Sequence, residues 1–294
     1  MSFALYLPPS WLEDSKRRSA ARIPDEVEFA TKPALAIQMI RRALLAGVPR
    51  GVVLADAGYG CGADFRRELR DLGLEYAVGV KSTTNVRRVS RDGLCHGKQH
   101  RLSTVAKQLQ KEGAFRRCTW RQGSRRAMSA GFARIQVQVG AAERATLLVE
   151  WRDYETEPAN YYLVSMAKVP VAMKQLVRLV MQRWRIERTY QDLKGELGLD
   201  HYEGRSYPGW HHHVSVVLAS YAFIVAERSR HFPPEAREAV ADRPDALAAG
   251  APLRGQLHHC AACGRAEDRH LVAEVPVLPS AERREEASGR GLTQ

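Results

Sequence analysis

The stretch from Gly51 to Gly60 constrains the fold of this chain more than any other. It reads Gly-Val-Val-Leu-Ala-Asp-Ala-Gly-Tyr-Gly, so an apolar run ends in a carboxylate and then a turn with two glycines. Such a run predicts a strand buried on both faces of a sheet, and the glycines predict a tight turn after it. Open α/β folds place their sites at that carboxyl edge. Asp56 is therefore either a functional carboxylate or the cap of the turn.

The residues before this run give mixed signals. Phe3 to Leu7 is a short apolar run that two prolines stop, and it predicts a strand. The charged stretch from Trp11 to Phe29 predicts a surface loop. Pro33 stands where a helix tolerates proline, in the first turn, and Gly47 ends a helix with two apolar faces.

The residues after Gly60 continue an alternation of predicted strands and helices. Phe65, Leu69 and Leu72 form one stripe of an amphipathic helix, and Tyr76 to Val80 predicts another strand. The order of strand, helix, strand, helix and strand predicts a parallel sheet segment.

The character of the chain changes from Ser82 to about Ala159. Arg101 to Lys111 predicts a helix, and antiparallel strands follow it. The alternation of polar and apolar residues over Arg134 to Val139 is typical of a half-buried strand. Thr146 to Trp151 and Tyr161 to Met166 predict two more strands.

A basic cluster precedes these strands. Its members are five arginines and one tryptophan: Arg116, Arg117, Trp120, Arg121, Arg125 and Arg126. Basic side chains around an aromatic suit a nucleic-acid backbone, and the net charge of +12 also points to a polyanion. The alternatives are a solvated charged loop and a proteome rich in arginine.

The helix predicted over roughly residues 171 to 197 carries a second carboxylate. At about 100° per residue, Arg183, Glu187 and Lys194 fall within roughly 40° of one another. They border an apolar stripe formed by Leu179, Ile186, Leu193 and Leu197. The alternative is an exposed helix with ordinary ion pairs, which contribute little.

Two further clusters contain metal-binding residue types. His211 to His213 precede an apolar helix that runs from Val214 to Ala226, and we interpret them as helix-start packing and phosphate contacts rather than a metal site. Cys260 and Cys263 lie in a loosely patterned tail and could hold zinc with nearby histidines, but a chance pair is the alternative.

The sequence shows no run long enough to predict a membrane span and no signal-peptide pattern at the start. The scattered cysteines do not resemble a disulfide framework. We therefore expect a cytoplasmic protein.

Two blocks of this sequence resemble the DDE transposases of bacterial insertion sequences. The first runs from Leu5 through Gly60; the second comprises Arg183 to Glu187, Lys194 to Asp200 and Tyr202 to Ser206. The resemblance implies a DDE superfamily endonuclease with an α/β fold. This implied fold has an RNase H-like catalytic core and a β-rich insertion between the second and third catalytic acids.

The resemblance also implies roles for individual residues. Asp56 would be the second catalytic acid and Glu187 the third, and both would be ligands of Mg²⁺, for which Mn²⁺ can substitute. Arg183 and Lys194 would contact the DNA phosphates. Arg205 and two members of the basic cluster, Arg121 and Arg125, are the other residues that we expect to contact DNA. The tyrosine of the family's Glu-helix signature is replaced here by Val180.

The family's first aspartate lies upstream of the strand that Phe3 to Leu7 matches. The resemblance therefore implies a core that is incomplete at the N-terminus, and an inactive protein. It divides the chain into a partial core over residues 1–81, a basic β-rich insertion over residues 82–169, a closing helical segment over residues 170–230 and a tail over residues 231–294.

The function expected from the resemblance is DNA transposition by metal-dependent strand cleavage and transfer. The partner would be double-stranded DNA, with a homodimer on the DNA and a location at the bacterial nucleoid. One alternative is a non-catalytic DNA-binding remnant that represses its own element. Another is a small zinc-dependent nucleic-acid module built on Cys260 and Cys263.

Overall fold

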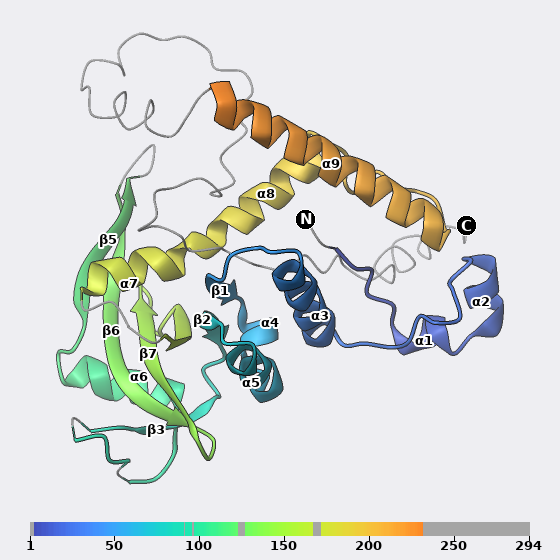
Figure 1. Cartoon of the computed structure of the whole chain (residues 1–294). Helices are drawn as coiled ribbons and strands as arrows, with labels where there is room; N and C mark the ends of the chain where they lie inside the picture. Colours follow the sequence, from blue (N-terminus) through green and yellow to red (C-terminus); the bar gives the residue numbers. More distant parts are fainter. Residues whose placement is uncertain (1–2, 91, 96, 123–126, 167–171, 232–294) are drawn as a thin grey trace, which may run out of the picture. The chain divides into compact units, whose positions relative to one another are not determined.

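The structure, a computed structural model, describes residues 3–90, 92–95, 97–122, 127–166 and 172–231. These residues belong to two compact units. One contains Lys32–Arg183, and the other contains Met1–Thr31 together with the segment that begins at Trp184. The helices and strands of each unit are labelled in Figure 1.

The first unit is built on one mixed sheet. Its strands are β1 (Val52–Ala55), β2 (Glu75–Val80), β3 (Asn85–Arg88), β4 (His100–Arg101), β5 (Arg116–Gln122), β6 (Ala127–Val139), β7 (Glu143–Trp151) and β8 (Asn160–Ser165). The order is β1-β2-β8-β7-β6-β3-β4, with β5 paired to β6. β1 and β2 are parallel, whereas β2 and β8 are antiparallel. Among the described strands, β1 therefore forms one edge of the sheet.

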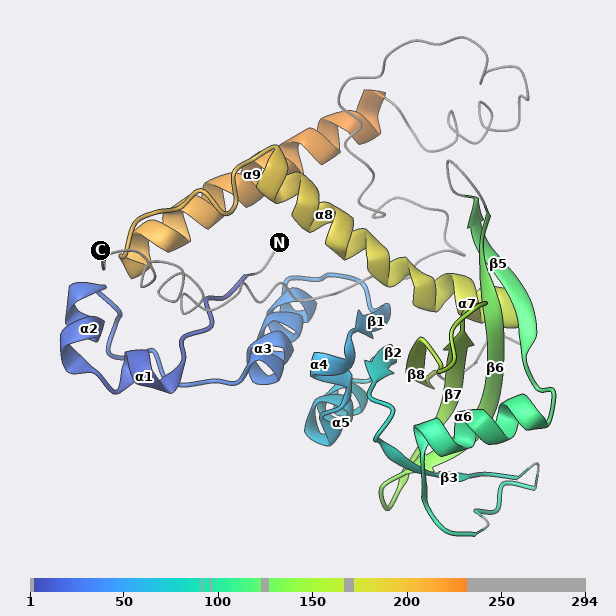
Figure 2. The same cartoon turned by 180° about the vertical axis from the view of Figure 1, so that it is seen from behind.

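Helices cover both faces of this sheet (Figures 1 and 2). One face packs against α3 (Lys32–Leu45), α5 (Ala63–Asp71) and α6 (Leu102–Lys111). The other face packs against α7 (Met173–Val180). Because successive side chains of a strand point to opposite faces, the apolar run of β1 supplies both cores and is buried throughout.

The second unit is helical in its described part. Its helices are α1 (Pro9–Leu12), α2 (Ser15–Ala20), α8 (Trp184–Gly195) and α9 (Tyr207–His231). Its core joins Leu193 of α8 and Leu199 to three residues of α9, namely Val214, Val217 and Tyr221. None of the described helices has the length and apolar character that a membrane span needs.

The expected α/β fold class is confirmed, and a mixed sheet covered by helices agrees with an RNase H-like core. The predicted strands at Asp56 and at Tyr76 are β1 and β2, and the predicted helices are α3, α5 and α6. The strands expected in the β-rich segment are also present, and they continue the sheet of β1 and β2. The domain boundaries remain a prediction.

The predictions for the first 30 residues were wrong. Phe3 to Leu7 contains a single bridge residue, Ala4, and no strand. The segment from Trp11 to Phe29, expected to be a loop, contains α2 and the end of α1. Asp14 explains α2, because its side chain accepts hydrogen bonds from two backbone N–H groups and thereby caps the helix.

The single helix predicted over residues 171 to 197 is interrupted. A 3₁₀ turn, η1 (Met181–Arg183), separates α7 from α8. The rotation of about 100° per residue therefore does not extend from Glu187 back to Arg183. The apolar stripe also divides, since Leu179 packs in the core of the first unit and Leu193 in that of the second.

Candidate active site

Asp56 stands directly after β1, at the carboxyl end of a strand whose four residues are all buried. It begins α4 (Ala57–Gly60), and its Oδ1 accepts hydrogen bonds from the backbone N–H groups of Gly58 and Tyr59, at 2.8 and 3.4 Å. We call residues 56–60 the Asp56 turn. The two interpretations of Asp56 are compatible, because the carboxylate caps the turn and its side chain is also exposed.

The Asp56 turn lies against the backbone of β2. A Cβ atom at Gly60 would lie 2.1 Å from the carbonyl oxygen of Gly79, and a Cβ atom at Gly79 would lie 3.0 Å from the backbone nitrogen of Ala57. Both distances are too short for a side chain, so the two glycines allow a backbone-to-backbone contact. This contact fixes the distance between the Asp56 turn and the backbone of β2.

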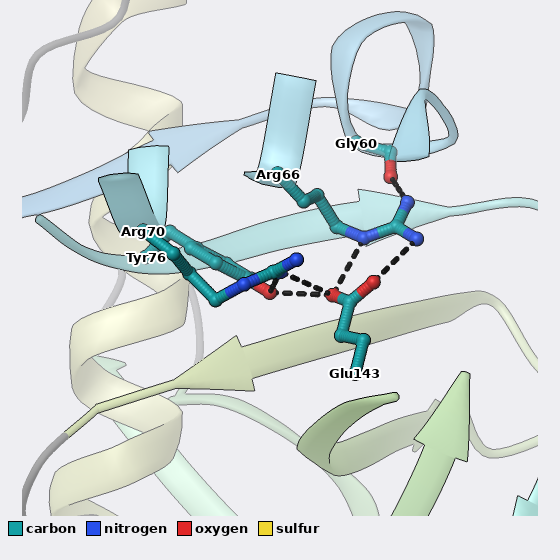
Figure 3. A network of polar contacts seen from close by, with 5 residues as sticks. All are labelled: Gly60, Arg66, Arg70, Tyr76 and Glu143. Atoms are coloured by element: carbon teal, nitrogen blue, oxygen red, sulfur yellow. Dashed lines mark hydrogen bonds and ion pairs between the residues drawn. The ribbon is translucent and has the colours of Figure 1, made fainter. Parts of the chain in front are cut away.

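A buried polar network supports the turn from the side (Figure 3). Arg66 of α5 donates from Nε and Nη2 to the two carboxylate oxygens of Glu143, at 2.8 and 2.9 Å, and from Nη1 to the carbonyl oxygen of Gly60, at 2.5 Å. The Tyr76 hydroxyl donates to Glu143 at 2.5 Å, and Arg70 donates to that hydroxyl at 3.0 Å. The side chains of Arg66 and Glu143 are 3% and 8% exposed.

The carboxylate of Glu143 is shared by two guanidinium groups, those of Arg66 and Arg70. Burial by itself raises the pKa of Glu143, but hydrogen bonds from Arg66 and Tyr76 and the charges of Arg66 and Arg70 hold this pKa below its ordinary value. Burial and the neighbouring carboxylate raise the pKa of Tyr76 to about 12. No sequence pattern predicted a role for these residues. The one local signal is that Arg66 stands beside Phe65 and three residues before Leu69, on the buried side of an amphipathic helix.

Glu187 lies in the first turn of α8 and its side chain is exposed. Lys194, in the last turn of the same helix, is also exposed. Seven residues at about 100° each return to nearly the same direction, so these two predicted residues share one face of α8. Arg205 lies exposed between α8 and α9.

Arg183 ends the 3₁₀ turn and is half-buried in the first unit. Burial and the charge of Glu150 raise the pKa of Tyr162 on β8, and the positive charge of Arg183 opposes this shift. Arg183 therefore lies within electrostatic reach of the sheet. Val180, at the position of the family's tyrosine, packs in the core of the first unit.

The two predicted acids, Asp56 and Glu187, belong to different units. Asp56 belongs to the unit of Lys32–Arg183, and Glu187 belongs to the unit that includes the segment beginning at Trp184. Within the described residues, no group of three or more His, Cys, Asp or Glu side chains is arranged to hold a metal ion. The pairing of Asp56 with Glu187 remains a prediction.

The described members of the basic cluster lie on β5. Arg121 is exposed there, whereas Arg125 and Arg126 lie outside the described residues. Arg117 pairs with Asp153, and Trp120 packs edge-on against Phe132. The tryptophan therefore belongs partly to the core of the sheet.

The three histidines begin α9. His211 lies 4.3 Å from the ring of Tyr207, and His213 is 3.1 Å from the carbonyl oxygen of Gly198. These contacts agree with the expected packing role, and the phosphate contact remains a prediction. Cys260 and Cys263 lie outside the described residues, as does the rest of the predicted tail beyond His231.

Comparison with known families adds an independent line of evidence. Residues 1–127 match the family described as DDE superfamily endonuclease. The match contains β1, the Asp56 turn, α5 and β2, and it ends before Glu187. The comparison with curated proteins gives no match. Residues 1–127 are therefore similar to the DDE superfamily endonucleases, in agreement with the resemblance of the sequence to the DDE-type transposases.

Proposed function

We propose that this chain is a DNA transposase by descent, from a family whose reaction is metal-dependent cleavage and transfer of DNA strands; a cleavage assay decides whether the chain itself is active. The observation that carries the proposal is the position of Asp56. A buried strand delivers this carboxylate, exposed, to the carboxyl edge of the sheet, inside the segment that matches the endonuclease family. This edge is where open α/β sheets place their sites.

The exposed carboxylate fits a hard divalent cation. Mg²⁺ prefers oxygen ligands, and Oδ2 of Asp56 accepts no hydrogen bond within the described part of the chain. Asp56 and Glu187 would hold Mg²⁺, or Mn²⁺ in its place. The metal would activate the attacking oxygen at phosphorus and stabilise the leaving one. The protein holds Asp56 in position through its cap, its contact with β2 and the network at Arg66.

We assign the DNA contacts to the basic residues that the sequence singled out. Lys194, Arg205 and Arg121 are exposed, as a phosphate contact requires, while Arg183 is half-buried beside the sheet and Arg125 lies outside the described residues. The net charge of +12 supports a polyanionic partner. Binding should therefore weaken as the salt concentration rises.

We also propose an oligomeric state and a location for the chain. Two copies would act together on DNA, in association with the bacterial nucleoid. Light scattering of the purified protein, with and without a DNA duplex, tests the dimer directly. A complex that contains one copy per duplex would contradict it.

The primary test measures metal binding, because it reports on the site independently of turnover. Mn²⁺ titration followed by electron paramagnetic resonance should show binding that weakens at least tenfold in Asp56→Asn and in Glu187→Gln. Asp64→Asn and Glu196→Gln serve as matched controls, because both are exposed carboxylates close in sequence to the predicted ligands. Unchanged Mn²⁺ binding in the first two variants would refute the shared site.

The second measurement is cleavage of a labelled DNA duplex in Mg²⁺ or Mn²⁺. Cleavage that both ligand variants abolish, with DNA binding intact, would support the nuclease. Salt-sensitive DNA binding without cleavage at any metal concentration would favour the non-catalytic repressor.

A further inference from the structure

The Arg66 network connects the Asp56 turn to a distant part of the chain. Glu143 begins β7, at the hairpin between β6 and β7, and it lies 77 residues from Arg66 in sequence. Arg66 bridges this carboxylate and the carbonyl of Gly60, the last residue of the turn. One guanidinium therefore ties the turn to the hairpin (Figure 3).

The bridge is held in a single arrangement. Two parallel hydrogen bonds to Glu143 fix the plane of the guanidinium, as in other bidentate arginine pairs. Tyr76 and Arg70 bind the same carboxylate from the other side, at 2.5 and 3.2 Å. Because Arg66 and Glu143 are almost fully buried, solvent and salt screen the pair very little.

The third hydrogen bond of Arg66 is the one directed at the turn. Gly60 is buried, and the last carbonyls of a helix have no partner within the helix. Arg66 supplies that partner. Without it, the buried carbonyl of Gly60 would need a new partner, which the turn could reach only by moving.

We propose that the Arg66–Glu143 pair is a positioning device that holds Asp56 in the geometry required for metal binding. This inference rests on the proposed function of Asp56. Arg66 and Glu143 act through the turn and are positioning residues, because their side chains are almost fully buried and Arg66 bonds to Glu143 and to the carbonyl of Gly60. Functional groups must be held within about 0.5 Å of the productive geometry by such supporting contacts.

The test compares two conservative variants with a matched pair. Arg66→Lys keeps the charge but cannot bond to Glu143 and Gly60 in the same geometry, and Glu143→Gln keeps the shape but removes the charge. Arg88→Lys and Glu112→Gln alter an exposed bidentate pair in the same unit, bonded at 2.6 and 3.0 Å.

Two readouts separate positioning from simple stability. Mn²⁺ affinity should fall about 10- to 100-fold in the Arg66 and Glu143 variants, the range for supporting residues of metal sites. Hydrogen exchange of the amides in the Asp56 turn should accelerate at least tenfold more than exchange in β7 and β8. Neither readout should change in the Arg88 and Glu112 variants.

The two readouts also separate this inference from the proposed function. If the parent protein binds no Mn²⁺ through Asp56, the proposed metal site fails, and the exchange measurement alone decides whether the pair holds the turn. Folded Arg66→Lys and Glu143→Gln proteins with parental exchange in the turn would overturn the positioning role. An equal acceleration throughout β7 and β8 would also overturn it, because the pair would then act only on global stability.

Discussion

Substitution of Gly60 by alanine probes the contact between the Asp56 turn and β2. The new Cβ atom would lie 2.1 Å from the carbonyl oxygen of Gly79 and 2.8 Å from Cβ of Val78. The first of these contacts is with backbone, which no side-chain rotation can relieve. The turn would therefore have to move away from the sheet by about 1 Å to reach an ordinary separation from these atoms.

The expected cost is that of overpacking a filled site, about 3 kcal/mol of unfolding free energy. For a unit of this size, each kcal/mol lowers the melting temperature by about 2–4 °C, so the total decrease is about 6–12 °C. Urea unfolding followed by circular dichroism measures both the midpoint and the slope. Gly62→Ala is the matched control, since a Cβ atom there would lie 3.4 Å from its nearest neighbour.

The control should change stability by less than about 1 kcal/mol, because a Gly-to-Ala change without strain has an effect of that size. If Gly60→Ala unfolds within about 0.5 kcal/mol of the parent protein, the turn does not pack on β2 as described. Of the three features that hold Asp56 in position, only the cap and the network at Arg66 would then remain.

The remaining predictions concern the polar contacts of the same unit. Glu143→Ala should cost about 3–5 kcal/mol, because it leaves Arg66 buried without its carboxylate, and the double change Glu143→Leu with Arg66→Met should recover most of this loss in urea unfolding. Burial raises the pKa of Glu143, but its hydrogen bonds and the neighbouring positive charges lower this pKa by more, so that it lies below its ordinary value. The contribution of Glu143 to the unfolding free energy is therefore complete above the ordinary carboxyl pKa of about 4.3. Acid titration of the unfolding free energy should show this contribution disappearing as the pH falls through the lower folded pKa, and the double variant should lack that component. Tyr76, with a pKa raised to about 12, should lose its contribution as the pH rises from about 10 to 12; a Tyr76→Phe protein with the same alkaline unfolding curve as the parent would contradict this. Glu112→Gln, at an ion pair with side chains 38% and 47% exposed, should change stability by less than about 1 kcal/mol.

The sequence by itself determined the local elements whose residues carry a clear period or punctuation. The apolar run predicted β1, the glycines predicted the turn after Asp56, and the stripe at Phe65 predicted α5. These signals are local, since backbone geometry repeats over two residues in a strand and 3.6 in a helix. The prediction failed where the start of a helix had only a weak signal. Asp14 caps α2, but the charged residues around it indicated a loop.

Only the tertiary structure decided how these elements meet. The pairing of β8 beside β2 joins segments far apart in the chain, and the same assembly brings Glu143 to Arg66 and Arg66 to Gly60. No periodicity records such contacts, because they depend on the order of strands in the sheet and not on neighbouring residues. The sequence alone identified Asp56 as a candidate ligand, whereas the tertiary structure supplied the glycine contact with β2 and the buried ion pair that hold its turn in place.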